Sequence, residues 1–372
     1  MSNIAHIAYS GIGGLAEVCL SLLTAARRLE NSSDQHCVGF YGVEPLAERY
    51  IDRCRSLDLD FRYIEKKAGY DSSSSRVMSK WLREHRPDVV ITHMTQTFLP
   101  FLRYKLSNPE ARVIVVEHHS NALKGAKDWL LTIINHWMSD TTVYLSGEYR
   151  DQVKKKLRFF LRDRKVRIIP NGLDIELYSP PKVRELKTEN LVFGMQGRMV
   201  GSKDYFTLIR AFAKFRESAA AGETARLEIA GDGPMLEELT ALAAELGVAE
   251  AVEFLGMIPQ DEMISRMQSW DIFVLSTFGE TMSRALMEAQ SCGLPLVASD
   301  VSGVSAAIDH GETGLLVPGQ DPSALAVALA ELAESPDLRR RLAENGRRHA
   351  VENFSADQSW SRYREVVSNV LA

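Results

Sequence analysis

The sequence is poor in cysteine, has no long apolar run and carries no excess of basic charge. Its cysteines form no C-x-x-C pair and have no paired histidine, so neither a zinc cage nor a disulfide scaffold is suggested; they are Cys19, Cys37, Cys54 and Cys292. No segment approaches the roughly 18 uninterrupted apolar residues of a membrane span, and the N-terminus lacks a charged segment followed by an apolar core. We therefore expect a chain that is neither exported nor membrane-spanning and that resides in a reducing cytoplasm.

Charge and composition narrow the class of protein further. The chain has 44 basic and 49 acidic residues and a net charge of -5, which argues against a dedicated nucleic-acid binder, so no nucleic-acid partner is expected. Its 45% hydrophobic and 25% charged residues are typical of folded protein. At 372 residues the chain is about twice the usual domain size, so we expect two domains.

Short apolar runs alternate with helical patterns, which is typical of α/β domains with a parallel sheet and helices on both faces. Predicted strands begin near residues 4, 36, 61, 88, 112, 141 and 166, and again near residues 191, 225, 251, 271, 294 and 313. Between the two series, residues 171–190 contain a Pro pair, Asn-Gly and many charges, as linkers do.

The pattern therefore predicts two doubly wound domains. The first spans residues 1–170 and the second residues 191–353, with a linker at 171–190 and a C-terminal helix at 354–372 that packs back on the first domain. Open parallel sheets bind ligands at the carboxyl ends of their strands. We therefore expect the chemistry in a cleft between the two domains.

A glycine-rich turn follows the first predicted strand. Gly11, Gly13 and Gly14 open a helix there, where bare backbone N–H groups favour an anion or the close approach of a ligand. Gly11, Gly13 and Ala16 also match the dinucleotide pattern G-x-G-x-x-A. The acid that should bind a ribose is missing at Tyr41 and Gly42. A nicotinamide site and a purely structural turn both remain alternatives.

The second half contains a more informative group of charged residues. Arg198 ends the strand near 191 and Lys203 precedes a helix, so two cations could meet a diphosphate, although single cations are often only solvated. Glu280 follows the strand near 271 and Glu288 lies in the next helix. At about 1.5 Å per residue along a helix, the two carboxylates are expected about 12 Å apart and could bind hydroxyls at both ends of a nucleotide sugar. Alternatively, one is solvated and the other caps the helix.

These motifs, taken in order, resemble those of retaining glycosyltransferases of family 4. The resemblance rests on GGLAEV near the N-terminus, IIPNGLD at 168–174, GRMVGSK at 197–203, AGDGP at 230–234, the E-x7-E segment, and LPLVASDVSGVSAAIDHGETGLLV at 294–317. It is strongest over residues 165–320. It implies the GT-B fold, in which two Rossmann-like doubly wound domains face each other across a cleft, with a variable first domain for the acceptor.

The resemblance also implies roles for individual residues. Arg198 and Lys203 would bind the donor diphosphate and assist its departure, Glu280 would face the donor sugar, and Glu288 would bind the ribose. The backbone of Thr281, Met282 and Ser283 would contact the sugar or phosphate, and Gly13 and Gly14 would line the nucleotide-sugar site. The histidine expected at the end of a first-domain strand is His118, with His119 as the less favoured neighbour.

We therefore interpret the protein as a retaining hexosyltransferase of the cytoplasm. It would move a sugar from a nucleotide-diphosphate donor, expected to be a UDP-sugar, to a glycan or lipid-linked saccharide in cell-surface polysaccharide synthesis, with no cofactor and no metal. Rival interpretations are a nucleotide-sugar epimerase of the same fold, a non-catalytic nucleotide-sugar-binding protein and a nicotinamide dehydrogenase.

Two further patterns have competing interpretations. The run Lys154–Arg162 mixes cations with aromatic residues on a predicted helix. It is either a solvated helix end or a face that contacts an anionic membrane on the inner side of the cell. Asp58 and Asp60 form the D-x-D of the other large glycosyltransferase fold, which we attribute to chance because the pattern reads as a loop entering a strand.

Overall fold

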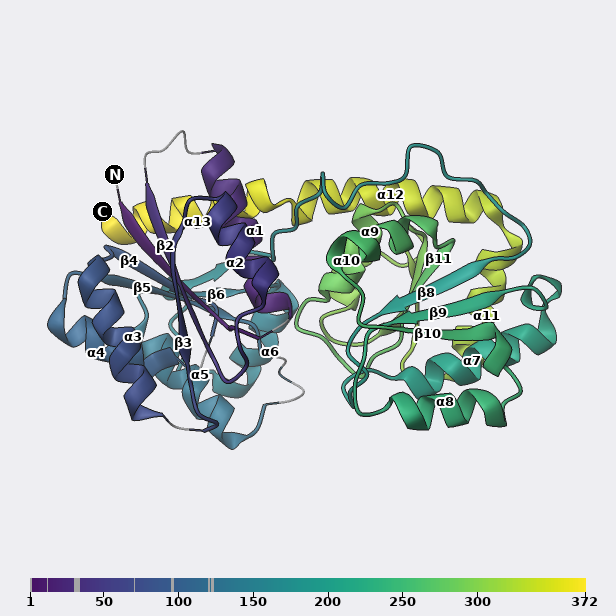
Figure 1. Ribbon diagram of the computed structural model, residues 1–372, viewed down its shortest axis with the longest axis horizontal. Helices are drawn as coiled ribbons and strands as arrows, with labels where there is room; N and C mark the ends of the chain where they lie inside the picture. Colours follow the sequence, from purple (N-terminus) through teal and green to yellow (C-terminus); the bar gives the residue numbers. More distant parts are fainter. Residues whose placement is uncertain are drawn as a thin grey trace. The chain divides into compact units, whose positions relative to one another are not determined.

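The structure is a computed structural model that describes residues 2–11, 13–29, 34–69, 71–94, 97–119, 121 and 124–372. The chain divides into two units. Unit 1 consists of Met1–Leu173 and Ser355–Ala372, and unit 2 consists of Asp174–Phe354. Both chain ends therefore belong to unit 1 (Figure 1).

Unit 1 contains a sheet of seven parallel strands in the order β3-β2-β1-β4-β5-β6-β7. Its strands are Asn3–Ala8 (β1), Gln35–Gly42 (β2), Asp60–Glu65 (β3), Val89–Thr92 (β4), Arg112–Glu117 (β5), Thr141–Tyr144 (β6) and Val166–Ile168 (β7). Its helices are Gly14–Leu29 (α1), Glu48–Ser56 (α2), Ser72–His85 (α3), Phe98–Ser107 (α4), Ala126–Met138 (α5), Gly147–Leu157 (α6) and Ala356–Leu371 (α13).

Helices cover both faces of this sheet because its central strands are apolar on both sides. On one face, Leu20 and Leu23 of α1 pack with Val38 and Phe40 of β2. On the other face, Trp81 of α3 packs against alternate residues of the same strands. The C-terminal helix α13 lies beside α1 (Figure 1). Unit 1 is thus a layered α/β unit that includes the last helix of the chain.

Unit 2 contains a sheet of six parallel strands in the order β10-β9-β8-β11-β12-β13. Its strands are Val192–Gln196 (β8), Arg226–Ala230 (β9), Val252–Gly256 (β10), Ile272–Leu275 (β11), Leu296–Asp300 (β12) and Leu315–Pro318 (β13). Its helices are Tyr205–Ser218 (α7), Leu236–Glu245 (α8), Gln260–Ser269 (α9), Arg284–Ser291 (α10), Pro322–Glu334 (α11) and Pro336–Phe354 (α12). The prediction of parallel α/β sheets in both halves of the chain is confirmed.

Local sequence signals account for several element ends. Asp71 caps α3 by accepting hydrogen bonds from the backbone N–H groups of Ser73 and Ser74. A hydrogen bond from the backbone N–H of Lys67, together with those from Ser73 and Ser74, holds the pKa of its carboxyl below its ordinary value. Proline opens both α11 and α12, where a first-turn residue needs no N–H donor. Asp58 has a positive φ of 49° in the turn before β3, and Asp60 starts that strand and bonds to His85. The D-x-D pattern thus reflects a turn and a strand start.

The segment predicted as a linker forms no helix or strand between β7 and β8, yet part of it is well packed in unit 2. The side chain of Tyr178 is buried, and its carbonyl accepts a hydrogen bond from Ser291. Arg184 donates to the carbonyls of Trp270 and Cys292. Tyr178 and Arg184 therefore anchor part of this segment to unit 2.

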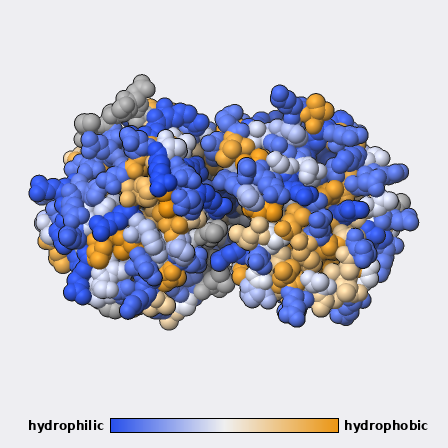
Figure 2. Space-filling model, in the orientation of Figure 1, coloured by the Kyte–Doolittle hydropathy of each residue, from blue (hydrophilic) through white to orange (hydrophobic). Residues whose placement is uncertain are grey.

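The face of the molecule drawn in Figure 2 is mostly polar. Figure 2 shows hydrophilic side chains over most of the visible face, interrupted by small apolar patches. Among the helices that the structure describes, none is both long enough and apolar enough to cross a membrane.

Candidate functional site

Unit 2 has a point where the order of its strands reverses. The chain moves outward from β8 to β9 and β10 on one side, and from β11 to β12 and β13 on the other. Loops that leave neighbouring strands in opposite directions open a crevice at their carboxyl ends, where α/β sheets bind ligands. Arg198 follows β8 and Glu280 follows β11, so both belong to this edge.

The turn after β8 is shaped by the AGDGP loop. The N–H groups of Gly197 and Met199 donate to the carbonyls of Ala230 and Asp232, at 2.9 and 2.8 Å. Gly231 has φ +132°, and a Cβ there would lie 2.0 Å from the carbonyl oxygen of Gly197. Only glycine permits so close an approach of the two loops. The AGDGP motif therefore fixes the turn that presents the exposed side chain of Arg198.

Lys203 and Glu280 form an ion pair at this edge, with side chains 15% and 18% exposed. The hydroxyl of Thr277 donates to the same carboxylate at 3.3 Å, and a β-bridge joins Lys203 to Thr277. Asp204, the next residue, caps α7 and donates its N–H to the carbonyl of Ser276. The ammonium of Lys203 is thus held in place by neighbours from both central strand ends.

The loop from Glu280 to Ser283 leads into α10. Its position is set by Gly303, whose φ is +77° and where a Cβ would lie 2.0 Å from the carbonyl oxygen of Glu280. Ser283 makes no side-chain cap, and the first turn of α10 has no acidic residue. No carboxylate in the first turn of α10 therefore offsets the positive end of its helix dipole.

The helical spacing assumed between Glu280 and Glu288 does not hold over the whole interval. The helix begins at Arg284, so half of the eight-residue spacing lies in the loop. The helical rise of about 1.5 Å per residue therefore cannot be used to estimate the distance between the two carboxylates.

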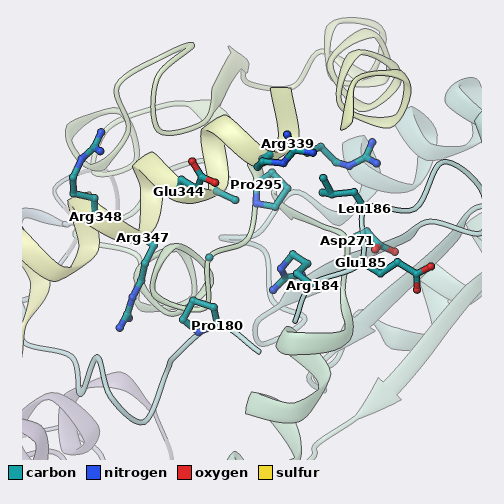
Figure 3. A pocket seen from close by; sticks show the side chains of 13 residues that line it. Pro180, Arg184, Glu185, Leu186, Asp271, Pro295, Arg339, Glu344, Arg347 and Arg348 are labelled. Atoms are coloured by element: carbon teal, nitrogen blue, oxygen red, sulfur yellow. The ribbon is translucent and has the colours of Figure 1, made fainter. Parts of the chain in front are cut away.

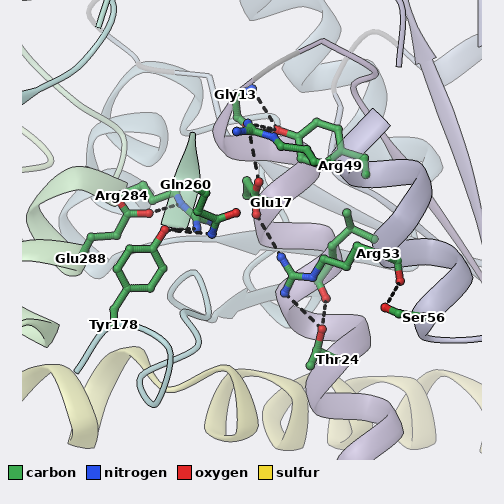
Figure 4. Close-up of polar contacts among 12 residues, drawn as sticks. Gly13, Glu17, Thr24, Arg49, Arg53, Ser56, Tyr178, Gln260, Arg284 and Glu288 are labelled. Carbon is green, nitrogen blue, oxygen red and sulfur yellow. Dashed lines mark hydrogen bonds and ion pairs between the residues drawn. The ribbon is translucent and has the colours of Figure 1, made fainter. Parts of the chain in front are cut away.

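Glu288 lies on α10 and is buried. Its carboxylate accepts a hydrogen bond from Arg284 at 2.6 Å, one helical turn away. Gln260 donates to the hydroxyl of Tyr178 at 3.0 Å, and Arg284 approaches the same hydroxyl at 3.5 Å (Figure 4). Burial raises the pKa of Tyr178, and the charge of Glu288 adds to this effect. The hydroxyl of Tyr178 is therefore a neutral hydrogen-bonding group.

Gly13 and Gly14 lie at the carboxyl edge of the sheet of unit 1, where α1 begins at Gly14. Both are exposed, and a Cβ at either would meet no atom within 4 Å. Gly13 and the hydroxyl of Tyr50 share hydrogen bonds of 3.3 Å. Glu17 in the first turn of α1 pairs with Arg53 at 3.0 Å (Figure 4). The turn is therefore open to a ligand, but its helix already carries a paired carboxylate.

His118 follows β5 at the same edge of unit 1. Its Nε2 lies 3.4 Å from Nδ1 of His93, which follows β4. Burial, with a smaller contribution from His93, holds the pKa of His118 well below its ordinary value, so its imidazole is neutral at pH 7. His119 instead places Nδ1 3.9 Å from a carboxylate oxygen of Asp128.

A buried ion pair lies directly beside His118. The ammonium of Lys124 contacts Glu117 at 2.7 Å, the hydroxyl of Tyr149 at 3.0 Å and that of Thr132 at 3.2 Å. The two charged side chains are 0% and 2% exposed. Tyr149 also donates to the carbonyl of His119. This network ties the loop after β5 to α5 and α6.

The buried histidines predict how stability depends on pH. Burial lowers the pKa of both His93 and His136 to about 4, and Lys165 and Arg162 add to the effect at His136. The unfolded chain takes up these protons near pH 6.5, so between pH 6.5 and 4 it binds more protons than the folded chain. We expect the free energy of unfolding to fall by about 1 kcal/mol per histidine when pH drops from 6 to 5.

Urea unfolding at pH 7, 6 and 5 measures this loss. His136 accepts from the N–H of Arg162 at 2.7 Å and contacts the hydroxyl of Thr142 at 3.0 Å, so His136→Gln keeps a neutral polar group there. When pH drops from 6 to 5, the free energy of unfolding of that variant should fall by about 1 kcal/mol less than that of the wild type. An unchanged pH dependence in the variant would contradict the assignment.

A pocket of about 530 Å³ lies elsewhere in unit 2 (Figure 3). Asp271 and Pro295 line it, and they precede β11 and β12, so it is at the amino ends of the strands. One of its arginines, Arg339, already serves the fold by donating to the carbonyls of Leu332 and Ala333. This pocket is therefore separate from the strand edge that carries Lys203 and Glu280.

The residues named from sequence fall in both units. Arg198, Lys203, Thr281, Met282, Ser283, Glu280 and Glu288 belong to unit 2, whereas Gly13, Gly14 and His118 belong to unit 1. Sequence reasoning missed Arg284, Tyr178 and His93. The i, i+4 spacing of Arg284 and Glu288 is a signal that could have indicated their ion pair. Nothing in the sequence pattern placed Tyr178 or His93 beside a site residue.

Two family models match the chain. The model described as Glycosyltransferase Family 4 matches residues 12–177, and the model described as Glycosyl transferases group 1 matches residues 180–349. A D-inositol 3-phosphate glycosyltransferase of Corynebacterium jeikeium is 32% identical over 217 residues, which cover 54% of this chain and 52% of that protein. One from Salinispora arenicola is 27% identical over 319 residues, covering 78% of this chain and 66% of that protein. The chain spans about half the length of the first of these relatives.

Solved structures share the fold along the whole chain. HepE of Anabaena, solved with UDP and glucose, has a TM-score of 0.81 at 19% identity and covers 99% of this chain and 100% of that chain. Sucrose-phosphate synthase of Thermosynechococcus elongatus has a TM-score of 0.79 at 18% identity, covering 100% and 99%. The two parallel α/β sheets thus define a GT-B fold. The chain belongs to glycosyltransferase family 4, which confirms the resemblance of its motifs.

Proposed function

We propose that the protein is a retaining glycosyltransferase that moves a hexosyl group from a nucleotide-diphosphate sugar, a UDP-sugar, to a glycan or lipid-linked saccharide in cell-surface polysaccharide synthesis. The observation that carries the proposal is the ammonium of Lys203, which Glu280 and the strand bridge to Thr277 hold at the point where the strand order reverses. The exposed guanidinium of Arg198 belongs to the same edge.

These cations would act on the leaving group. Breaking the bond between sugar and phosphate builds negative charge on the departing diphosphate, and fixed cations stabilise that charge more in the transition state than in the ground state. At about 4 Å and an effective dielectric near 20, each contact is worth on the order of 4 kcal/mol before desolvation. We assign this role to the two side chains, with no metal ion and no cofactor. The open N-terminus of α10 supports it with backbone N–H groups of Thr281, Met282 and Ser283 nearby.

The remaining residues would orient the substrates. Glu288, held by Arg284, offers carboxylate oxygens for the vicinal hydroxyls of the ribose, and Glu280 does the same for the donor sugar. The neutral imidazole of His118 would exchange hydrogen bonds with a sugar hydroxyl rather than act as a cation. Retention then proceeds by front-side attack, with the departing phosphate accepting the proton of the acceptor and no covalent glycosyl-enzyme.

We propose a division of labour between the parts of the chain. The N-terminal domain of residues 1–170 would bind the acceptor, and residues 191–353 would bind the nucleotide sugar. Exposure of Gly13 and Gly14 at the carboxyl edge of the first sheet supports a ligand there. Two carboxylates lie near that turn: Glu17 pairs with Arg53, and Glu44 accepts a hydrogen bond from the hydroxyl of Tyr9. Their negative charge disfavours the pyrophosphate of a nicotinamide dinucleotide.

A ligand screen tests the proposal against its rivals. UDP, GDP, ADP, NAD and the corresponding sugars are added in turn, and the melting temperature of the full chain is measured. A ligand that binds only the folded state raises it, and we expect the largest rise with UDP or a UDP-sugar. Glu280→Gln should retain UDP affinity but lose sugar transfer. A non-catalytic nucleotide-sugar-binding protein would show no sugar transfer in either the wild type or this variant. Donor conversion without acceptor would indicate an epimerase instead.

We also propose that unit 1 contacts an anionic membrane where a lipid-linked acceptor resides. Three lysines end α6, and the turn after it exposes Phe159 by 88% and Phe160 by 47%. Trp137 is 50% exposed and has the guanidinium of Arg162 4.3 Å from its ring centroid. Exposed aromatic rings beside cations fit the boundary between acyl chains and anionic headgroups.

Replacing Phe159 and Phe160 together by serine should lower binding to vesicles with anionic lipid by about tenfold, because two apolar side chains no longer enter the interface. Flotation with anionic and with neutral vesicles measures this. Val183→Ser is the matched control, since Val183 is an apolar side chain 85% exposed in unit 2. Equal flotation of wild type with both kinds of vesicle would remove the membrane proposal and leave the solvated helix end.

A further inference from the structure

Three side chains with metal-binding atoms meet inside unit 1. They are His6 on β1, Cys19 on α1 and His93 just after β4, and each is 0% exposed. Their candidate ligand atoms all lie within 4.8 Å of one another. The cluster is at the face of the sheet that α1 and α13 cover, since Trp360 of α13 places its ring centroid 6.1 Å from that of His6.

The histidines of this cluster lack the partners that buried polar groups need. Neither Nδ1 nor Nε2 of His6 has a hydrogen-bond partner, and neither does Nε2 of His93. Leaving such a buried group unsatisfied costs about 1–3 kcal/mol, and native structures rarely do so without an ion or a water at the site. Cys19 forms no disulfide. Imidazole nitrogens and a thiol sulfur therefore lie close together in one buried place.

This donor set selects a class of ion. Two imidazoles and one thiolate suit zinc and related borderline-soft divalent metals, whereas magnesium and calcium require oxygen ligands. Metal–ligand distances of about 2.0–2.3 Å place tetrahedral ligand atoms roughly 3.3–3.6 Å apart. Atoms at most 4.8 Å apart would therefore have to approach one another by no more than about 1.5 Å on binding the ion. His36 on β2 is a neighbour that could complete the set, with its ring centroid 5.6 Å from that of His6.

We propose that His6, Cys19 and His93 bind a zinc-like divalent transition metal as a structural centre of unit 1. On binding, the thiol of Cys19 gives its proton to solvent and coordinates as thiolate, and both histidines coordinate as neutral imidazoles. The ion joins β1, α1 and the end of β4, and it satisfies ring nitrogens that otherwise have no partner. No oxidation change and no reaction at the metal is involved.

The centre would also orient His118. A metal on Nε2 of His93 leaves the ring proton on Nδ1, and this proton points to Nε2 of His118 at 3.4 Å. His93 would thus be a positioning residue that fixes the tautomer of His118. The metal centre itself is independent of the proposed function, since it would exist in unit 1 whether or not the protein transfers a sugar.

The test uses the full chain, purified after expression with zinc and separately with cobalt. Zinc content is measured by mass spectrometry after extensive dialysis, and the cobalt protein is examined by absorption. We expect about one equivalent of metal, together with a thiolate-to-cobalt charge-transfer band and intense tetrahedral d–d bands. Cys19→Ala should lose the charge-transfer band and lower metal retention at least tenfold. Cys292→Ala, an equally buried thiol in unit 2, should keep both.

Wild-type protein that retains no metal, or a cobalt spectrum of six-coordinate type without thiolate bands, would overturn the proposal. So would a Cys19→Ala protein with the wild-type spectrum. If Cys19→Ala does not fold, His93→Gln takes its place: it should retain less metal than the wild type, and wild-type retention would overturn the proposal. Loss of sugar transfer is not used as a readout, so a wrong assignment of the function leaves this result unaffected.

Discussion

Replacing Lys203 by alanine should lower the turnover of the donor by about 10²–10³-fold, because one fixed cation no longer stabilises the leaving diphosphate. The side chain of Lys203 is only 15% exposed and its ammonium is held by Glu280, so it needs little reorganisation when charge develops. Its loss also leaves the carboxylate of Glu280 without its partner, which repels an incoming diphosphate. We therefore expect weaker binding of UDP in addition to slower turnover.

Calorimetry with UDP and the rate of UDP release from the preferred donor measure the two effects. Arg198→Ala should act in the same direction, and Lys203→Arg should recover binding more than turnover, because a guanidinium keeps the charge but not the geometry. Lys214→Ala is the matched control, since Lys214 is an exposed lysine on α7. If Lys203→Ala folded like wild type and kept both UDP affinity and turnover, the proposed role of this edge would be lost.

Replacing Lys124 by methionine should lower the free energy of unfolding by about 3–5 kcal/mol, because the carboxylate of Glu117 would remain buried without its countercharge. The two side chains are 0% and 2% exposed, so water cannot take over the role of the ammonium. Urea unfolding followed by circular dichroism measures the loss. The loop that carries His118 and His119 depends on this network, so sugar transfer should decline in the same variant.

The double variant Lys124→Met with Glu117→Gln separates the charge from the packing. It removes both charges, and we expect it to recover a large part of the lost stability. Lys127→Met is the control, because Lys127 is an exposed lysine in the first turn of α5, close to Lys124 along the chain. A double variant no more stable than Lys124→Met would mean that packing of the long side chain, rather than the paired charge, stabilises this loop.

The sequence by itself determined the class of fold. Apolar runs flanked by helical patterns predicted parallel sheets in both halves, because a strand buried on both faces must be apolar throughout and a parallel connection needs a helix. It also located Arg198, Lys203, Glu280 and Glu288 at strand ends or in the helix that follows, since short motifs remain contiguous in the chain. These features depend only on residues that are close together along the chain, so they can be recognised from the sequence alone.

Tertiary structure decided which distant residues meet. Lys203 contacts Glu280 only because β8 and β11 are neighbours in the sheet, and a helical reading of the interval from Glu280 to Glu288 failed because the chain first passes through a loop. The buried side chain of Tyr178 lies in a segment that reads as solvated linker.

The cysteine pattern shows the same limit. Spacing along the chain suggested no metal ligands, yet β1, α1 and the end of β4 bring His6, Cys19 and His93 together. Sequence spacing reports ligands only when they share one turn or hairpin, whereas a sheet can assemble them from segments far apart. Strand order, which depends on the packing of the whole unit, fixes such contacts, and no local pattern of residue types encodes it.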